Sequence, residues 1–533
     1  MKRTLVLILA LVMVLGLMPG AALAEDASLT ICIGSQPETL DPQLNSASDG
    51  SDYIQHLFEG LMRREWDGSG IGPGAAESYT VSEDGMTWTF KIRENAKWSD
   101  GVDLVAEDFV YGFQRLVDPA TAAPYAEDMG MFILNGSAIV AGEMDPSELG
   151  VTAIDSKTLE VKLQEFSSVF MDVMAFAAYM PVRKDVIEAH GDGWFTRPET
   201  IVGNGPYKME SWSMDEEIVM VPNEYYHEVD KLVAKKLVFK LITDPIAKLA
   251  AVRAGEIDWC DDIPSEEREA VIAEGLYHET PVLGTYYVNI NNSKAPFDNV
   301  LVRKALALAI DPYYLSENAA NNIYMPATNF VGPGFFDADG KQFMDKKVIF
   351  DRSDYEANIA LAKEALAEAG YPDGEGFPTV EYVTNVSGVH IATAEALQAM
   401  WKDVLGINIE IGQMEWNAFL EFRREGHHTL ARDGWVADFN DPSNLLMLMH
   451  SRSGNNSTKY SNPDYDAIMD KAAAEVNSAA RMALMHQAEE LAFGEEYAAI
   501  PVYYYTQYYV KQPSVTGFAL YPTNDKVFCL ASK

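Results

Sequence analysis

The most distinctive stretch of the sequence runs from Ala76 to Pro119 and reads AESYTVSEDGMTWTFKIRENAKWSDGVDLVAEDFVYGFQRLVDP. Shorter stretches flank it in a fixed order along nearly the whole chain. They are Leu40-Asp41-Pro42, Val202-Gly203-Asn204-Gly205-Pro206-Tyr207, Ala254-Gly255-Glu256-Ile257-Asp258, Ala295-Pro296-Phe297 followed by Val302-Arg303-Lys304-Ala305-Leu306, and Ala437-Asp438-Phe439-Asn440-Asp441-Pro442. No single stretch is decisive for the fold, but their order is.

Strand-like and helical patterns alternate along the chain. Strands are predicted at 29–34, 88–92, 158–163, 235–242, 285–290 and 498–505. Leu237, Phe239 and Leu241 recur at every second position, which is typical of a half-buried strand. Helices are predicted over 354–369, with Ser353 as N-cap and Gly370 as the stop, and over 391–405. Mixed helix and strand throughout indicates an α/β fold.

The length of the chain indicates several domains, and its net charge excludes one class of partner. The 533 residues suffice for several domains, at roughly 100–200 residues each. Forty Lys and Arg stand against 80 Asp and Glu, a formal net charge of −40. A surface with that excess of acid repels phosphate backbones, so we expect no nucleic-acid partner.

The first residues predict export. Lys2 and Arg3 precede an apolar run over 5–18, and Ala22-Leu23-Ala24 follows with the small residues that signal peptidase requires. The run is shorter than the ~20 residues that span a bilayer, so residues 1–24 are interpreted as a signal peptide cleaved near Ala24. Cys32 lies too far from that site for lipid attachment. We therefore expect an unlipidated protein, periplasmic or extracellular at the cell surface.

Neither a disulfide framework nor an enzyme motif is evident. Cys32, Cys260 and Cys529 allow at most one bridge, are too scattered for closely spaced thiolate metal ligands, and are typical of core packing. The chain has no H-E-x-x-H, no G-x-S-x-G and no phosphate-binding G-x-x-x-x-G-K-[ST]. Two carboxylates could still meet in the fold for acid–base chemistry, so a secreted hydrolase stays an alternative. No catalytic residue, metal site or cofactor is predicted.

The stretch 76–119 and the ordered shorter stretches closely resemble the extracellular solute-binding proteins, family 5, which serve peptide-importing ABC transporters. The resemblance implies a two-lobed periplasmic-binding-protein-like fold with an extra domain and a hinge of two crossing strands, closing on an extended peptide. It also implies a function: capture of oligopeptides and delivery to ABC transporter permease subunits, by a monomer without enzymatic activity. Relatives that bind nickel complexes, haem, sugars or antibiotics leave a non-peptide solute as an alternative.

The resemblance also implies a domain plan. Lobe I is expected to combine residues 25–58, 198–284 and 506–533, and lobe III to cover 285–505. The extra domain II is expected at 59–197. Crossing between the lobes is therefore expected near 284/285 and 505/506.

A receptor for peptides of varied sequence has to bind what all peptides share: an ammonium, a backbone and a carboxylate. By resemblance, Asp438 pairs with the ammonium, whereas Asp441 before Pro442 is typical of a cap or turn. Main-chain pairing is expected from Gly434-Trp435-Val436 and from Ser46-Ala47-Ser48. Val436 stands where a relative has the cysteine of a disulfide, so that bridge is not expected here.

The remaining predicted contacts lie upstream and downstream of that strand. By the same register, Arg432, Arg423 and His390 meet peptide carboxylates, because a guanidinium offers paired donors in a planar fork. Internal or surface ion pairs stay the alternative for both arginines, and a solvated loop position for His390. Trp416 and Trp435 are expected on the walls of side-chain pockets. From Tyr503-Tyr504-Tyr505 one hydroxyl is expected in the cleft, assigned to Tyr504.

Overall fold

The structure, a computed structural model, describes residues 28–167 and 169–533. Its main feature is an 11-stranded mixed sheet with the order β15-β14-β16-β12-β17-β11-β1-β10-β9-β8, to which β13 adds by pairing with β17. The strands are β1 (Ser28–Cys32), β8 (Tyr207–Ser213), β9 (Glu217–Pro222), β10 (Lys236–Lys240), β11 (Trp259–Asp261), β12 (Tyr277–Ile290), β13 (Met325–Pro326), β14 (Val380–Asn385), β15 (Ile409–Met414), β16 (Leu430–Val436) and β17 (Ala499–Lys511).

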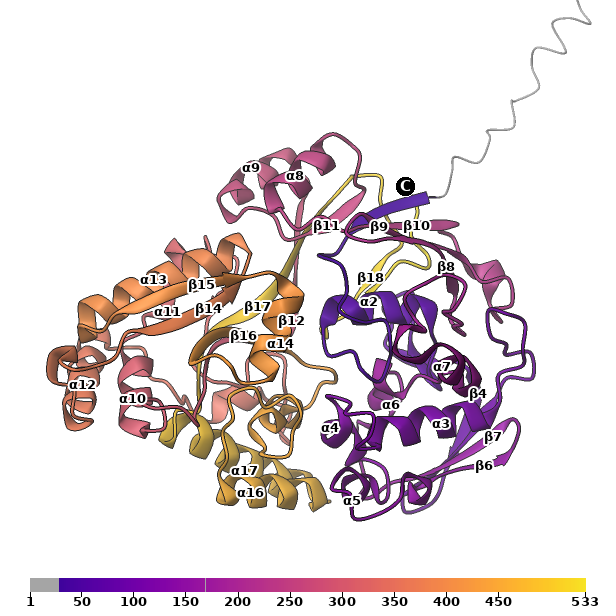
Figure 1. Ribbon diagram of the computed structural model, residues 1–533, viewed down its shortest axis with the longest axis horizontal. Helices are drawn as coiled ribbons and strands as arrows, with labels where there is room; N and C mark the ends of the chain where they lie inside the picture. Colours follow the sequence, from indigo (N-terminus) through magenta and orange to yellow (C-terminus); the bar gives the residue numbers. More distant parts are fainter. Residues whose placement is uncertain (1–27, 168) are drawn as a thin grey trace, which may run out of the picture.

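Two long strands, β12 and β17, join the two halves of the molecule (Figure 1). They pair with each other in antiparallel fashion; β17 also pairs with β11 on one side, and β12 pairs with β16 on the other. Their register breaks between Pro281 and Thr285. The fold is therefore the predicted two-lobed α/β architecture with two crossing strands. The limits at 284/285 and 505/506 fall beside this break and remain predictions.

Both crossing strands are longer than the sequence predicts, since β12 begins at Tyr277 and β17 ends at Lys511. The missed part of β12 carries polar residues that are exposed or half-buried, whereas the part from Val282 onward is buried. A hydrophobic pattern therefore marks only the end of the strand that lies in a core.

The first lobe surrounds β1 and β8–β11. Helix α2 (Ser48–Leu57) packs against β8, α8 (Pro245–Arg253) against β11, and α9 (Arg268–Glu274) against β12. Leu237, Phe239 and Leu241 are all buried, which confirms the alternation predicted for that strand. Cys32 and Cys260 are register partners on β1 and β11, and all three cysteines are free and buried.

A smaller antiparallel sheet lies beside this lobe. Its order is β4 (Ala76–Val81), β5 (Thr87–Ile92), β7 (Thr158–Lys162) and β6 (Val151–Asp155), and α3 (Ala106–Val117) packs against β6 and β7. This part of the molecule also contains a hairpin and four short helices. They are β2 (Met62–Arg64) with β3 (Ile71–Pro73), α4 (Ala126–Gly130), α5 (Gly136–Val140), α6 (Phe170–Val173) and α7 (Lys184–His190). One apolar core runs through both this sheet and the first lobe, so the two form one body at the right of Figure 1.

The stretch 202–207 joins these two parts. A Cβ on Gly203 would lie 1.9 Å from the Leu57 carbonyl oxygen, so only glycine fits there. Asn204 accepts a hydrogen bond from the Glu59 backbone N–H at 3.0 Å and donates to the Glu59 carbonyl at 2.8 Å. This stretch thus holds the end of α2 in place.

The second lobe, at the left of Figure 1, contains β13–β16 and eight of the sixteen α-helices of the described residues. These are α10 (Val300–Leu308), α11 (Pro312–Asn318), α12 (Tyr355–Glu368), α13 (Gly388–Leu405), α14 (Trp416–Arg424), α15 (Pro442–Leu446), α16 (Pro463–Ala474) and α17 (Ser478–Glu489). The two predicted helices are confirmed as α12 and α13. The N-cap of α12 is Asp354, whose carboxylate accepts from the Ala357 N–H, and not Ser353.

Candidate functional site

A cavity of about 530 Å³ lies between the two halves of the molecule. The first lobe, the second lobe and the smaller sheet all contribute to its wall. All the predicted site residues except Tyr504 line it: Ser46, Ala47, Ser48, His390, Trp416, Arg423, Arg432, Gly434, Trp435, Val436 and Asp438. The structure therefore brings together residues that are almost 400 positions apart in the sequence.

Strand β16 forms one wall and leaves part of its edge open. It pairs with β12 over its whole length, from Leu430 to Val436. On its other side β14 pairs only with Leu430 and Ala431. Among the described residues, no strand pairs with that side of Arg432–Val436. An extended chain could therefore add to this edge through its main-chain groups.

Asp438 follows β16 and is held by neutral donors alone. Its Oδ1 accepts from the Tyr125 hydroxyl at 2.9 Å, and its Oδ2 accepts from Asn444 Nδ2 at 2.9 Å. No basic side chain of the described residues lies within ion-pair distance of this carboxylate. Burial raises the pKa of Asp438 to about 7. The site thus holds a carboxylate that lacks a counter-charge.

Asp441, three residues on, behaves as predicted for a cap. Its Oδ1 accepts from the Ser443 N–H at 3.0 Å at the start of α15, and the carboxylate pairs with Arg481 at 2.8 Å. The two acids of this stretch therefore have different environments.

Arg423, in the last turn of α14, forms an ion pair with Asp433 of β16. The Asp433 carboxylate also accepts from Asn289 Nδ2 at 2.8 Å and from the Ser457 hydroxyl at 3.0 Å. The internal ion pair, which the sequence left open as an alternative, is thus what the structure has for Arg423, although Arg423 also lines the cavity.

Arg432 has no carboxylate partner among the described residues. Its Nη2 lies 2.7 Å from His390 Nε2, and its guanidinium lies 5.6 Å from the Trp416 ring and 5.8 Å from the Tyr286 ring. Burial, with the Arg432 charge, keeps the pKa of His390 well below its ordinary value, so the imidazole is neutral and accepts this hydrogen bond. His390 lies in α13 and is 8% exposed, so a solvated loop position is wrong for it.

Tyr504 requires a correction. Its hydroxyl accepts from the backbone N–H groups of Thr328 and Asn329 at 3.1 and 2.9 Å, away from the cavity, and Tyr505 lines the cavity instead. Neighbouring side chains of a strand point to opposite faces, so a shift of one residue moves the hydroxyl to the other side. Three consecutive tyrosines give no signal that fixes this register.

Several wall residues were not predicted. Arg64, Tyr125 and Phe176 come from the smaller sheet and its helices, and Lys248, Asp261, Asp262 and Gln507 come from the first lobe and β17. Arg64 Nη2 donates to the Asp438 carbonyl at 3.2 Å, while its charge pairs with Asp525. Nothing in the local sequence marks these positions, because only the packing of the lobes brings them to the cavity.

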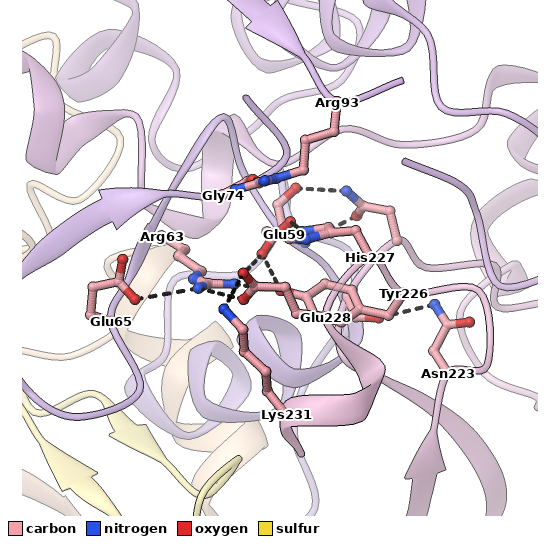
Figure 2. Close-up of polar contacts among 12 residues, drawn as sticks. Glu59, Arg63, Glu65, Gly74, Arg93, Asn223, Tyr226, His227, Glu228 and Lys231 are labelled. Atoms are coloured by element: carbon pink, nitrogen blue, oxygen red, sulfur yellow. Dashed lines mark hydrogen bonds and ion pairs between the residues drawn. The ribbon is translucent and has the colours of Figure 1, made fainter. Parts of the chain in front are cut away.

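Figure 2 shows a second polar cluster, and none of its labelled residues lines this cavity. Glu59 lies 2.7 Å from His227 Nε2 and accepts from the Tyr226 hydroxyl, and Arg63 pairs with Glu228 at 2.8 Å. The cluster links the start of the smaller sheet's segment to the loop after β9. Its charges are compensated within the protein, which is typical of a structural network.

Within residues 28–167 and 169–533, no group of three or more His, Cys, Asp or Glu side chains is placed to hold a metal ion. No helix in that part of the chain is long and apolar enough to cross a membrane. The predicted signal peptide lies outside the described residues.

Comparisons with known proteins agree on one family. Residues 70–457 match the sequence model described as bacterial extracellular solute-binding proteins, family 5 middle. The periplasmic oligopeptide-binding protein OppA of Salmonella typhimurium is 35% identical over 513 residues, 96% of this chain and 93% of OppA.

Solved structures give the same result. Haemophilus influenzae OppA in complex with RPPGFSPFR has a TM-score of 0.87 at 31% identity, covering 94% of this chain and 97% of that one. The murein tripeptide-binding protein MppA of Escherichia coli also scores 0.87 at 33% identity, covering 93% and 96%; its unliganded open form scores 0.63 at 33% identity, covering 95% and 96%. The chain belongs to family 5 of the bacterial extracellular solute-binding proteins.

Proposed function

We propose that this protein captures oligopeptides in the cavity between its lobes and delivers them to the permease subunits of an ABC importer, with no chemistry of its own. The proposal rests on one observation above all. Within the part of the chain that the structure describes, the Asp438 carboxylate forms no ion pair with a cation and the Arg432 guanidinium forms none with a carboxylate, and both groups line the cavity. A peptide carries the two missing charges. The relatives named oligopeptide-binding proteins support the same cargo.

Asp438 is the proposed anchor of the α-ammonium. Tyr125 and Asn444 satisfy one lone pair on each of its oxygens, which fixes the carboxylate and leaves further lone pairs for the ligand. A bound ammonium would supply the missing counter-charge and lower the pKa of Asp438. Charge-assisted bonds of this kind are about twice as strong as neutral ones.

The peptide backbone is proposed to add as a strand to the open edge of β16. Gly434 and Val436 lie in that edge, and Ser46–Ser48 from the first lobe also line the cavity. Main-chain pairing binds peptides with little sequence preference, because every peptide offers the same donors and acceptors. Trp416 and Trp435 would then flank the side chains.

Arg432 is the proposed partner of the terminal carboxylate. It is buried beside a neutral imidazole, so an incoming carboxylate meets a desolvated cation that forms no ion pair with any described residue. Arg423 would contribute less, because Asp433 already compensates it.

Closure of the lobes would complete the site. Tyr125 and Arg64, on the first-lobe side, contact Asp438 on the second-lobe side. The higher similarity to one MppA structure than to its open form supports an arrangement in which the lobes are closed. A ligand favours the closed form only through contacts that it makes better there.

We also propose that the protein is exported, that its signal peptide is cleaved near Ala24, and that the mature protein is an unlipidated monomer. The lobes are proposed to divide near 284/285 and 505/506. The mass of the secreted protein tests cleavage near Ala24: a diacylglyceryl group at Cys32 would contradict it. Size-exclusion chromatography with light scattering tests the monomer.

Native mass spectrometry of the purified protein, followed by calorimetry with a pool of peptides of varied length, tests the cargo. We expect bound peptides that are released intact, and a rise in melting temperature that corresponds to about 2.7 kcal/mol at a hundredfold excess over Kd. Tryptophan fluorescence should change as well. Binding of a nickel complex, haem or sugar in place of peptides would overturn the proposal, and cleaved peptides would establish a hydrolase.

A further inference from the structure

A second group of acids lines the same cavity on the first-lobe side. Asp261 ends β11, Asp262 follows it, and Asp49 lies in the first turn of α2. The Asp262 carboxylate accepts from the Tyr508 hydroxyl at 3.1 Å, and Asp49 accepts from the Gly50 N–H at 2.9 Å. None of these three acids shares a partner with Asp438, which Tyr125 and Asn444 hold.

The acids outnumber the cations near them. Lys248 Nζ lies 3.6 Å from Asp261 and 3.9 Å from Asp262, so two carboxylates share one ammonium at distances longer than a hydrogen bond. Lys526 also lines the cavity, but its ammonium pairs with Asp52 at 2.7 Å. This part of the cavity therefore carries an excess of negative charge.

An unpartnered amide lines the same region. Gln507 is 7% exposed and lines the cavity, and neither its Nε2 nor its Oε1 has a hydrogen-bond partner among residues 28–167 and 169–533. Gln507 and Tyr508, whose hydroxyl donates to Asp262, both line the cavity. A buried amide without partners costs stability, and such groups in folded proteins call for an explanation. A ligand with several N–H donors would satisfy the Gln507 oxygen together with the carboxylates.

We propose that Asp49, Asp261, Asp262 and Gln507 form a subsite for the cationic side chain of a lysine or arginine in the bound peptide, which makes the protein selective for basic peptides. The inference rests on the proposed function. An ammonium or guanidinium matches the site because it is a cation with only donors, whereas the site offers mostly acceptors. Burial raises the pKa of Asp49 to about 6, as expected for acids that lack a counter-charge.

The net charge of the chain adds to the selectivity. A formal charge of −40 attracts cationic peptides over distances larger than the cavity and increases their rate of encounter. The subsite would then convert that general attraction into preference at one position of the peptide.

Calorimetry on the full mature protein tests the subsite. The probes are alanine peptides of three to five residues that carry one lysine or one Nε-acetyl-lysine at each position in turn. At one position after the first we expect lysine to bind about tenfold or more tighter than acetyl-lysine. Asp49→Asn, Asp261→Asn and Asp262→Asn should each bring this ratio of Kd values closer to one.

Two further variants sharpen the test. Asp298→Asn removes one exposed acid outside the cavity, so the ratio should keep its wild-type value. Gln507→Glu adds a carboxylate inside the subsite and should raise the preference for lysine over acetyl-lysine several-fold. Asp261→Asn and Asp262→Asn each remove a partner of Lys248. If either of them does not fold, Gln507→Glu still tests the subsite.

The outcomes separate the two proposals. If peptides bind but lysine and acetyl-lysine bind equally at all positions, the subsite is wrong and the proposed function stands. If the ratio is large and none of the subsite variants changes it, the residues are wrong. If no peptide binds, the proposed function fails and the subsite fails with it.

Discussion

Asp433 and Asp438 lie five residues apart, but only the Asp433 carboxylate forms an ion pair with another described residue. Asp433 is compensated inside the protein by Arg423 and by donors from Asn289 and Ser457. Asp438 receives hydrogen bonds only from neutral groups. A buried charge is costly unless something pairs with it, so the unpaired member indicates where a ligand supplies the partner.

The two arginines show the same contrast. Arg423 forms an ion pair with Asp433, whereas the polar side chain that contacts the Arg432 guanidinium among the described residues is the His390 imidazole. Paired groups are therefore expected to contribute to stability, and unpaired groups to affinity. Each prediction below tests that division.

The largest effect is expected at the paired acid. Asp433→Ala leaves Arg423 without its partner and removes the acceptor for Asn289 and Ser457, which should lower the free energy of unfolding by about 3 kcal/mol. Urea denaturation measures this loss. Unchanged stability, with loss of selectivity for free amines, would place the ligand anchor at Asp433 and reverse the assignment.

The next effect is expected at the unpaired acid. Asp438→Asn should weaken peptides with a free α-amine about 10–150-fold, because a charge-assisted bond contributes roughly 1.5–3 kcal/mol, and should affect N-acetylated peptides far less. Calorimetry with matched pairs of peptides gives the ratio.

Asp441→Ala is the control for the second prediction. It removes a helix cap and the partner of Arg481, so it should cost about 1 kcal/mol of stability without changing the preference for a free amine. An unchanged amine preference in Asp438→Asn would contradict the anchor.

A third prediction concerns pH. The pKa of Asp438 is about 7 without ligand, so the carboxyl is neutral below that pH and ionised above it. Free-amine peptides need the ionised form, but their own ammonium is partly deprotonated at pH 8. Their affinity should therefore fall about three- to fivefold from pH 8 to pH 6. N-acetylated peptides should show a much flatter profile. Equal profiles for the two kinds of peptide would argue against the assignment.

The smallest effect is expected across the lobes. Tyr125→Phe removes the hydroxyl that donates to Asp438 Oδ1, and a neutral hydrogen bond contributes roughly 0.5–1.5 kcal/mol. The affinity for free-amine peptides should therefore fall about two- to tenfold, and the midpoint of the pH profile should rise. A fall as large as that of Asp438→Asn would mean that Tyr125 itself binds the ligand.

Sequence reasoning found most of the wall that the second lobe contributes and little of the opposite wall. Asp438, Trp435 and Arg432 sit in or beside one strand, so a single register placed all three. Tyr125 and Asp262 reach the cavity only because the lobes meet there. The triple tyrosine shows another limit, since the face of a strand depends on a register that three identical residues do not reveal.

Residue roles were harder to predict than residue positions. Arg423 and Arg432 both line the cavity, as expected, but only the structure shows that Asp433 pairs with the first and not with the second. Eighty acidic residues offer too many partners for the sequence alone to identify the right one.

The position of β17 has a consequence for how the chain folds. This strand lies between β12 and β11, so the two groups of strands join only after residues 499–511 have been made. The residues beyond it return to α2, where the Lys526 ammonium pairs with Asp52 and the Phe528 N–H donates to His56. Contacts of such long sequence separation form slowly. The N-terminal lobe can therefore be completed only after the whole chain has been synthesised.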